Sequence, residues 1–179
     1  MTTFCPPFTP MVDLLEPTVG KKFAIQKFAV RAGQARIESL LWPASYGRLE
    51  AGEYMRLICH KDLPNADDHR ISVWMSDTPN ERLWSLDFIM RAHGDVLVAG
   101  LGIGMVIPAL LRSPDVKRIL VVEKESEVIS LTWTQNLEPK LTAIDRERVE
   151  IAHGDIFEWY PPRGRWFSTI WLDVWGDVS

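Results

Sequence analysis

A short apolar stretch that leads into a glycine-rich turn and then a helix is the feature that most constrains the fold of this chain. Residues 96–99 (Val-Leu-Val-Ala) predict a buried strand, residues 100–104 (Gly-Leu-Gly-Ile-Gly) a tight turn, and residues 105–111 a helix with Pro108 in its first turn. Glycine lets the backbone approach a ligand closely, and the helix N-terminus behind it favours negative or electron-rich groups. Tight turns between a strand and a helix also use glycine for purely structural reasons, so both roles stay open.

The alternation of strand and helix continues to the end of the sequence. Further apolar strands are predicted at residues 118–122, 149–152 and 169–172, and a helix at residues 127–137. Near-continuous apolar strands separated by helices are typical of a parallel sheet that is buried on both faces. We therefore expect an α/β fold whose Rossmann-like core has about four parallel strands.

A helix is predicted immediately before this core. Residues 78–81 (Thr-Pro-Asn-Glu) have the capping-box pattern with proline at the first helical position, and Gly94 is the expected stop. Apolar residues recur at the spacing of one helical face. The face expected to be buried consists of Leu83, Leu86 and Met90, widened by Trp84 and Phe88.

The first part of the chain, residues 1–77, does not show this alternation of strands and helices. Residues 1–20 contain four prolines and no periodicity, which is typical of an arm. Strands are expected at residues 23–30, 35–41, 54–59 and 70–75, separated by turns and a charged loop. The sequence thus predicts a Pro-rich arm (1–20), a small antiparallel β region (21–77) and a Rossmann-like domain (78–179).

Composition excludes several classes of protein. Hydrophobic residues make up 46% and charged residues 25%, which is typical of a globular chain and not of collagen, coiled coil or wholly disordered protein. The net charge of −4 argues against a large nucleic-acid footprint, although it leaves room for a local basic patch. The sequence has neither a signal peptide nor an apolar run long enough to cross a bilayer, so we expect a cytoplasmic protein. Cys5 and Cys59 are expected to be reduced, and the four histidines lack metal-site spacing, so no metal is expected.

Carboxylates follow three of the predicted strands. Glu123, 19 residues after Gly104, can accept hydrogen bonds from both hydroxyls of a ribose, or it is a helix-start acid or a partner of Lys124. Asp155 can accept a bond from an exocyclic amine, or it is a simple turn aspartate. Asp173 ends the last strand. Because ligands of open α/β sheets bind at the carboxyl ends of the strands, these side chains predict a ligand site there.

Four segments together resemble the class I S-adenosylmethionine-dependent methyltransferases: residues 96–104, 121–123, 154–156 and 170–173. The resemblance covers about residues 94 to 175. It implies that S-adenosylmethionine is the cofactor, with its methionine portion on the glycine loop, its ribose on Glu123 and its adenine framed by Asp155 and Ile156. It also implies that Asp173 lies near the sulfonium and the acceptor, as the catalytic residue. The implied loop residues are Gly100, Leu101, Gly102 and Gly104.

The β region before the core is similar to the arrangement in the spermidine synthase branch of that superfamily. That branch carries an Asp-x-x-Asp near the fourth strand, whereas this chain has Asp173 and Asp177, so methyl transfer is preferred and aminopropyl transfer is the alternative. Asp77, just before the capped helix, is expected to border the same pocket as a substrate residue. Met105 stands where the dinucleotide fingerprint requires its third glycine, which argues against an NAD-dependent oxidoreductase.

The family core has seven strands, whereas this sequence stops just after the fourth. A catalytically incomplete binding or assembly protein that keeps the fold is therefore a further alternative. If residues 1–179 are the entire protein and not part of a longer one, we also expect an open apolar edge at Ile170, Trp171, Leu172 and Trp175, and with it self-association into a homo-oligomer or low solubility. The residues do not identify the acceptor.

Overall fold

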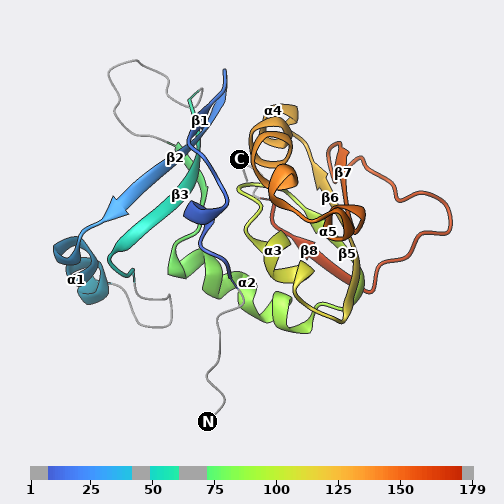
Figure 1. Ribbon diagram of the computed structural model, residues 1–179, viewed down its shortest axis with the longest axis horizontal. Helices are drawn as coiled ribbons and strands as arrows, with labels where there is room; N and C mark the ends of the chain where they lie inside the picture. The colour runs from blue at the N-terminus through green and yellow to red at the C-terminus, as the bar shows by residue number, and fades with distance from the viewer. Residues whose placement is uncertain (1–7, 42–48, 61–71, 175–179) are drawn as a thin grey trace, which may run out of the picture.

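The computed structural model describes residues 8–41, 49–60 and 72–174 of the chain. These residues form two four-stranded sheets, one antiparallel and one parallel, whose strand orders are β1-β2-β3-β4 and β7-β6-β5-β8 (Figure 1). The fold is therefore mixed α/β, and its parallel half is compatible with a Rossmann-like arrangement. Among the described residues, no helix has the length and apolar character needed to cross a membrane.

The antiparallel sheet confirms the predicted β region. Every neighbouring pair in it is antiparallel, and residues 70 and 71 of the expected fourth strand lie outside the described residues. The strands are β1 (Thr18–Val19), β2 (Phe23–Val30), β3 (Gly52–Cys59) and β4 (Ser72–Ser76).

The strand predicted at residues 35–41 is wrong, because this segment belongs to helix α1 (Ala32–Leu41). Its residues are mostly good helix formers, with alanine, glutamine, arginine, glutamate and leucine in place of the β-branched and aromatic residues of true strands. Ile37 is the one β-branched residue in it. Local helix propensity therefore outweighs the resemblance to the neighbouring strands.

Residues 8–20, the described part of the predicted arm, pack against the rest of the molecule. A single 3₁₀ turn, η1 (Met11–Asp13), is followed by β1, which pairs with β2. The side chains of Phe8, Met11 and Leu15 are buried in the main hydrophobic core. This segment is thus an integral layer of the structure.

The parallel sheet confirms the strands predicted for the second half of the chain. Its first strand in sequence, β5, lies inside the sheet; the chain adds β6 and then β7 on one side and returns to add β8 on the other. The strand order therefore reverses between β5 and β8, which makes this the switch point where open α/β sheets bind ligands. The strands are β5 (Gly94–Ala99), β6 (Val116–Glu123), β7 (Val149–His153) and β8 (Thr169–Leu172).

Helices connect these strands much as predicted. The helix expected at residues 127–137 is a short α-helical turn that continues into a π-helix. The helical elements are α3 (Val106–Leu111), α4 (Ser126–Val128), the π-helix η3 (Ile129–Leu137), the 3₁₀ turn η4 (Glu138–Lys140) and α5 (Ala143–Glu147).

Helix α2 (Pro79–Arg91) begins at the predicted proline but differs from the prediction in three ways. The Thr78 side chain makes no capping bond and lies 3.1 Å from the Ser76 hydroxyl instead, and the helix ends before Gly94. Its buried face consists of Ser85, Phe88 and Ile89, whereas Leu83, Trp84 and Met90 are exposed. The Phe88 ring stacks on Trp171 of β8 at 4.8 Å, so a partner distant in sequence sets which face is buried.

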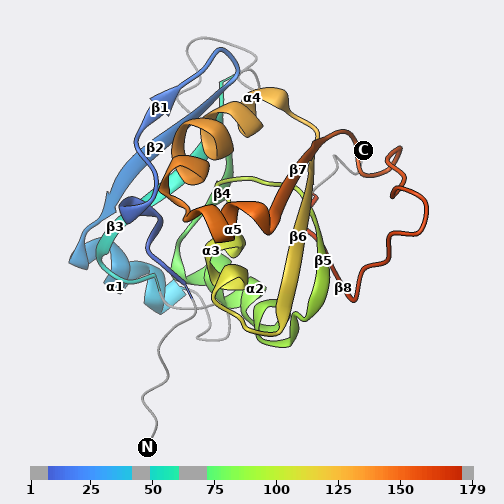
Figure 2. The same cartoon turned by 45° about the vertical axis from the view of Figure 1, so that its right-hand side comes forward.

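The hydrophobic core runs from one sheet to the other. Phe23 and Met55 of the antiparallel sheet share it with Val96, Val98 and Ile119 of the parallel sheet, beneath the helices. The opposite face of the parallel sheet forms a second, smaller cluster of Leu97, Leu120 and Val122 with Ile156, Trp159 and Phe167 packed against it. Both views show the β7–β8 connection as the chain on that side of the sheet (Figures 1 and 2).

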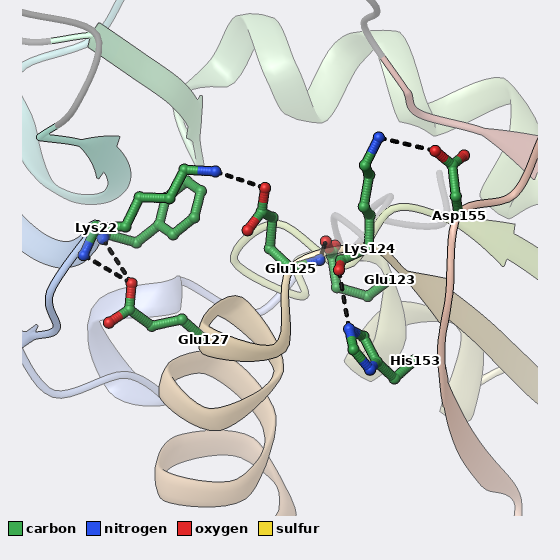
Figure 3. Close-up of polar contacts among 8 residues, drawn as sticks. Lys22, Glu123, Lys124, Glu125, Glu127, His153 and Asp155 are labelled. Carbon is green, nitrogen blue, oxygen red and sulfur yellow. Dashed lines mark hydrogen bonds and ion pairs between the residues drawn. The ribbon is translucent and has the colours of Figure 1, made fainter.

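A single carboxylate ties the antiparallel sheet to the helix after β6. The Glu127 side chain accepts hydrogen bonds from the backbone N–H groups of Lys21, Lys22 at 2.8 Å and Phe23 at 3.0 Å. The Lys22 ammonium also pairs with Glu125 at 2.6 Å (Figure 3). Burial opposes ionisation of Glu127, but these N–H groups outweigh it and lower the pKa of the carboxyl below its ordinary value of 4.5.

The hydrogen bonds between Glu127 and the backbone of residues 21–23, here called the Glu127 clamp, predict how the free energy of unfolding changes with pH. Because the pKa of Glu127 is lower in the folded chain than in the unfolded chain, its stabilisation is full above the unfolded pKa and is lost as pH falls through the folded pKa. We expect Glu127→Gln to lower the free energy of unfolding by about 1 kcal/mol at neutral pH, with a smaller further loss than wild type in acid. Urea titrations across pH measure this. The exposed Glu147→Gln is the control, and equal acid slopes for all three proteins would contradict the clamp.

Candidate functional site

The glycine loop lies at the carboxyl edge of the parallel sheet, directly after β5. Gly100, Gly102 and Gly104 have φ angles of 92°, 53° and 71°, in the left-handed region that side-chain-bearing residues rarely adopt. The turn is closed by hydrogen bonds from Gly100 N–H to the Val122 carbonyl at 2.9 Å and from Gly104 N–H to the Leu101 carbonyl at 2.8 Å. The backbone therefore requires glycine at all three positions.

Neighbouring elements pack against all three glycines. A methyl group on Gly100 would collide with the backbone carbonyl of Asp173, and one on Gly102 or Gly104 would collide with Met75 or Leu137. The loop therefore packs against β4, η3 and the end of β8. Its glycines thus have the structural role that the sequence analysis left open beside a ligand-binding role.

The polar groups of the loop are mostly held from within the protein. The Thr132 hydroxyl donates to the Gly102 carbonyl at 2.7 Å, and the Ile103 N–H points at the Met75 sulfur at 3.5 Å, a weak acceptor. Within the described part of the chain, the Gly102 N–H has no hydrogen-bond acceptor. This N–H is thus the donor that the loop can offer to a ligand.

Glu123 links the end of β6 to the glycine loop. Its carboxylate is 8% exposed and accepts hydrogen bonds from Leu101 N–H at 2.7 Å and from Glu125 N–H at 2.8 Å. The bond to Glu125, which precedes α4, matches the helix-start alternative, whereas Lys124 pairs elsewhere. Each carboxylate oxygen can accept a second hydrogen bond, so Glu123 keeps capacity for hydroxyl groups.

Asp155 lies at the same edge, beyond the end of β7. The Lys124 ammonium donates to it at 2.8 Å (Figure 3). The Phe157 N–H also donates to it, at 3.0 Å. The Lys124 hydrogen bond, followed by that of Phe157, lowers the pKa of the Asp155 carboxyl. Asp155 therefore has the contacts of the turn-aspartate alternative, while its place at the rim is the one expected for a ligand residue. Ile156 packs into the second hydrophobic cluster.

Asp173 follows β8, and its backbone N–H donates to the Ala99 carbonyl at 2.9 Å. Its charge acts on Glu81 in the first turn of α2, a residue that the sequence indicated only as a helix cap. Burial and then the negative charge of Asp173 raise the pKa of Glu81, against a hydrogen bond from the Ser76 backbone. Two carboxyl groups from distant segments thus influence each other electrostatically near the switch point. No local pattern signals such a pairing.

Asp77, expected to contact a substrate, lies in the interior. It has no exposed surface and accepts hydrogen bonds from Met11 N–H at 2.8 Å, Met55 N–H at 2.7 Å and the Arg82 guanidinium at 2.8 Å. A side chain with no exposed surface has no face to offer a substrate. In this structure Asp77 therefore holds η1, β3 and α2 together, which corrects the expectation that it contacts a substrate.

The structure thus brings Glu123 and Asp173 against the glycine loop, leaves Asp155 at the rim, and adds Met75 and Glu81. No group of three or more histidine, cysteine or acidic residues suited to a metal occurs in residues 8–41, 49–60 and 72–174. A cleft of about 760 Å³ opens at the opposite, amino-terminal edge of the sheet, where Arg148 and Arg165 line it. Arg148 binds backbone carbonyls and Arg165 pairs with Glu150 at 2.6 Å, so both have structural partners there.

A scan of the sequence against models of known protein families finds no match, and neither does a search of curated proteins. The geometry of the carboxyl edge is therefore the basis for a functional proposal.

The packing of the glycine loop yields a test of its conformation. We expect Gly102→Ala to lower the free energy of unfolding by about 1–3 kcal/mol, because alanine meets both the positive φ and the Met75 side chain. The matched control is Gly33→Ala in α1, where the added methyl meets no atom and helix propensity favours a gain of up to about 1 kcal/mol. Urea unfolding followed by tryptophan fluorescence compares them. Equal effects of the two substitutions would contradict the described loop.

Proposed function

We propose that this chain is an S-adenosylmethionine-binding transferase, most simply a methyltransferase, whose ligand lies at the carboxyl edge of the parallel sheet. The observation that carries the proposal is the bond between Leu101 N–H and Glu123, which couples the glycine loop to the carboxylate at the end of the next strand. Glycine loop, Glu123 and Asp173 thereby converge at the switch point between β5 and β8. Ligands of open α/β sheets bind at this point.

The residues present suit the parts of this ligand to different degrees. The Gly102 N–H is a donor for the methionine carboxylate, and Glu123 has unused acceptor capacity for the ribose hydroxyls. Lys124 and Phe157 already donate hydrogen bonds to Asp155. An adenine amine would therefore have to use the remaining lone pairs of the Asp155 oxygens. The Ile156 side chain is engaged in the second cluster, so it contributes its backbone to an adenine pocket.

The bound sulfonium supplies an already activated methyl group. The task of the protein is therefore to align this group with the acceptor and to manage one proton. Asp173 is the residue proposed to orient the acceptor and accept its proton. Glu81, on which the charge of Asp173 acts, has a raised pKa, so it keeps its own proton to higher pH than an ordinary glutamate. Glu81 as the carboxyl that holds its proton and Asp173 as the proposed proton acceptor are suited to separate donor and acceptor roles.

Aminopropyl transfer is the second candidate function. The observation that favours it is the electrostatic coupling of Glu81 and Asp173, because two acidic side chains whose charges interact attract a cationic amine acceptor. Release of methylthioadenosine indicates aminopropyl transfer, whereas release of S-adenosylhomocysteine indicates methyl transfer. Assays with S-adenosylmethionine, its decarboxylated form and a panel of amine and hydroxyl acceptors separate the two.

Ligand binding is the first test of the proposal. By calorimetry we expect wild type to bind S-adenosylhomocysteine and not NAD. Glu123→Gln is expected to weaken binding by about 1.5–3 kcal/mol, the usual loss for a charged hydrogen bond. Glu147→Gln, on α5, is the control and keeps wild-type affinity. Circular dichroism checks that Glu123→Gln is folded. A wild type that binds neither S-adenosylmethionine nor S-adenosylhomocysteine would contradict the proposal.

Turnover tests Asp173 separately from binding. Asp173→Asn keeps the shape of the side chain but removes its capacity to accept a proton, so we expect a rate loss of about 100-fold or more with nearly unchanged affinity. Asp87→Asn, at an exposed position of α2 paired with Arg91, serves as control. Wild-type turnover in Asp173→Asn would remove this residue from the reaction.

A further inference from the structure

The cleft of about 760 Å³ lies at the amino-terminal ends of β5, β6 and β7, at the edge of the sheet opposite the glycine loop. These strands contribute Asp95, Arg118 and Glu150, all on the face that carries the second hydrophobic cluster. Residues 163–166 (Arg-Gly-Arg-Trp) of the β7–β8 connection also line the cleft. Segments far apart in the sequence therefore build it, and its volume is in the usual range for a small-molecule site.

Two arginines of the cleft are held in place by the protein itself. Arg165 pairs with Glu150 at 2.6 Å, and its guanidinium lies 5.6 Å from the centre of the Phe167 ring. Arg148 donates to backbone carbonyls, among them that of Val116 at 2.7 Å. These contacts hold the connecting loop and the end of α5 against the strands, so they give the cleft a defined shape.

Two other arginines of the cleft have no such partners. The side chains of Arg118 and Arg163 are exposed, and no described residue forms an ion pair or a hydrogen bond with either guanidinium group. A guanidinium group presents a planar fork of N–H donors that matches the oxygens of a phosphate. This pair is a local basic patch on a chain whose net charge is −4. The cleft therefore offers two unused donor groups to an anion.

The remaining lining residues restrict what this anion can be. Trp166 is 85% exposed, and an exposed indole is a flat surface on which a nucleobase can stack. Asp95 and Glu147 also line the cleft and have no ion-pair partner within the described part of the chain. Carboxylates repel a bare polyanion but accept hydrogen bonds from hydroxyl groups such as those of a ribose. The lining thus suits a ligand that combines phosphate, hydroxyl groups and a planar ring.

We propose that this cleft binds a free nucleotide, with its phosphates on Arg118 and Arg163 and its base on Trp166. The size of the cleft suits one nucleotide. A nucleic-acid strand needs a longer basic surface, which the net charge of −4 disfavours. The cleft and the proposed S-adenosylmethionine site lie at opposite edges of the sheet, so this inference does not rest on the proposed function.

Calorimetry with ADP as the probe tests the phosphate contacts. We expect wild type to bind ADP with a dissociation constant below about 1 mM, and more weakly as salt is added. Adenosine and pyrophosphate each lack one part of the ligand, so each is expected to bind at least about tenfold more weakly. Arg118→Gln and Arg163→Gln are each expected to weaken ADP binding about tenfold. The matched control is Arg31→Gln, an exposed arginine between β2 and α1 that keeps wild-type affinity.

The stacking contact has its own variant. Trp166→Ala is expected to weaken ADP binding about tenfold, towards the affinity of pyrophosphate, and to leave pyrophosphate binding unchanged. A structural defect would instead weaken both ligands. Trp84→Ala, at an exposed tryptophan of α2, is the matched control and keeps wild-type affinity.

Four results would overturn the proposal. These are a wild type that does not bind ADP, ADP affinity that none of the three cleft variants changes, competition between ADP and S-adenosylhomocysteine, and tighter binding of a single-stranded RNA hexamer than of ADP. Binding of ADP without binding of S-adenosylhomocysteine would contradict only the proposed function.

Discussion

The buried carboxylate of Asp77 lies where the antiparallel sheet ends and α2 begins, and the placement of the surrounding elements depends on it. It receives the N–H groups of Met11 and Met55 and the guanidinium of Arg82, so η1, β3 and α2 converge on one side chain. Removing one partner of a buried ion pair leaves the other charge unpaired, at a typical cost of about 3–5 kcal/mol. Because α2 leads directly into β5, this joint also sets the position of the parallel sheet.

Two further carboxylates use the same chemistry, Glu127 where the halves of the molecule meet and Glu123 within the parallel half. Glu127 receives three backbone N–H groups of the segment before β2, and Glu123 receives those of Leu101 and Glu125. The carboxylate oxygens of these side chains thus accept hydrogen bonds from backbone N–H groups that have no partner in either sheet. In Glu123 this structural role and the proposed ligand role fall on one residue, so a variant there must be judged by fold and binding together.

The candidate site and the open sheet face meet at the end of β8. Asp173 belongs to the site through its contact with Gly100 and its influence on Glu81, while Ile170 and Leu172 belong to the exposed face. A short strand therefore leads into the site at Asp173 and carries exposed apolar side chains at Ile170 and Leu172.

The sequence by itself determined the four parallel strands, the β region and the tight glycine turn at residues 100–104, because apolar runs and glycine-rich turns are local properties. It also placed Glu123, Asp155 and Asp173 at one edge, which follows from parallel strand order. The α1 helix was missed although its residues favour it. Tertiary structure alone decided which face of α2 is buried, that Asp77 lies in the interior, and that the charge of Asp173 acts on Glu81. These outcomes depend on contacts such as Phe88 with Trp171, between residues far apart in the chain, which no local pattern encodes.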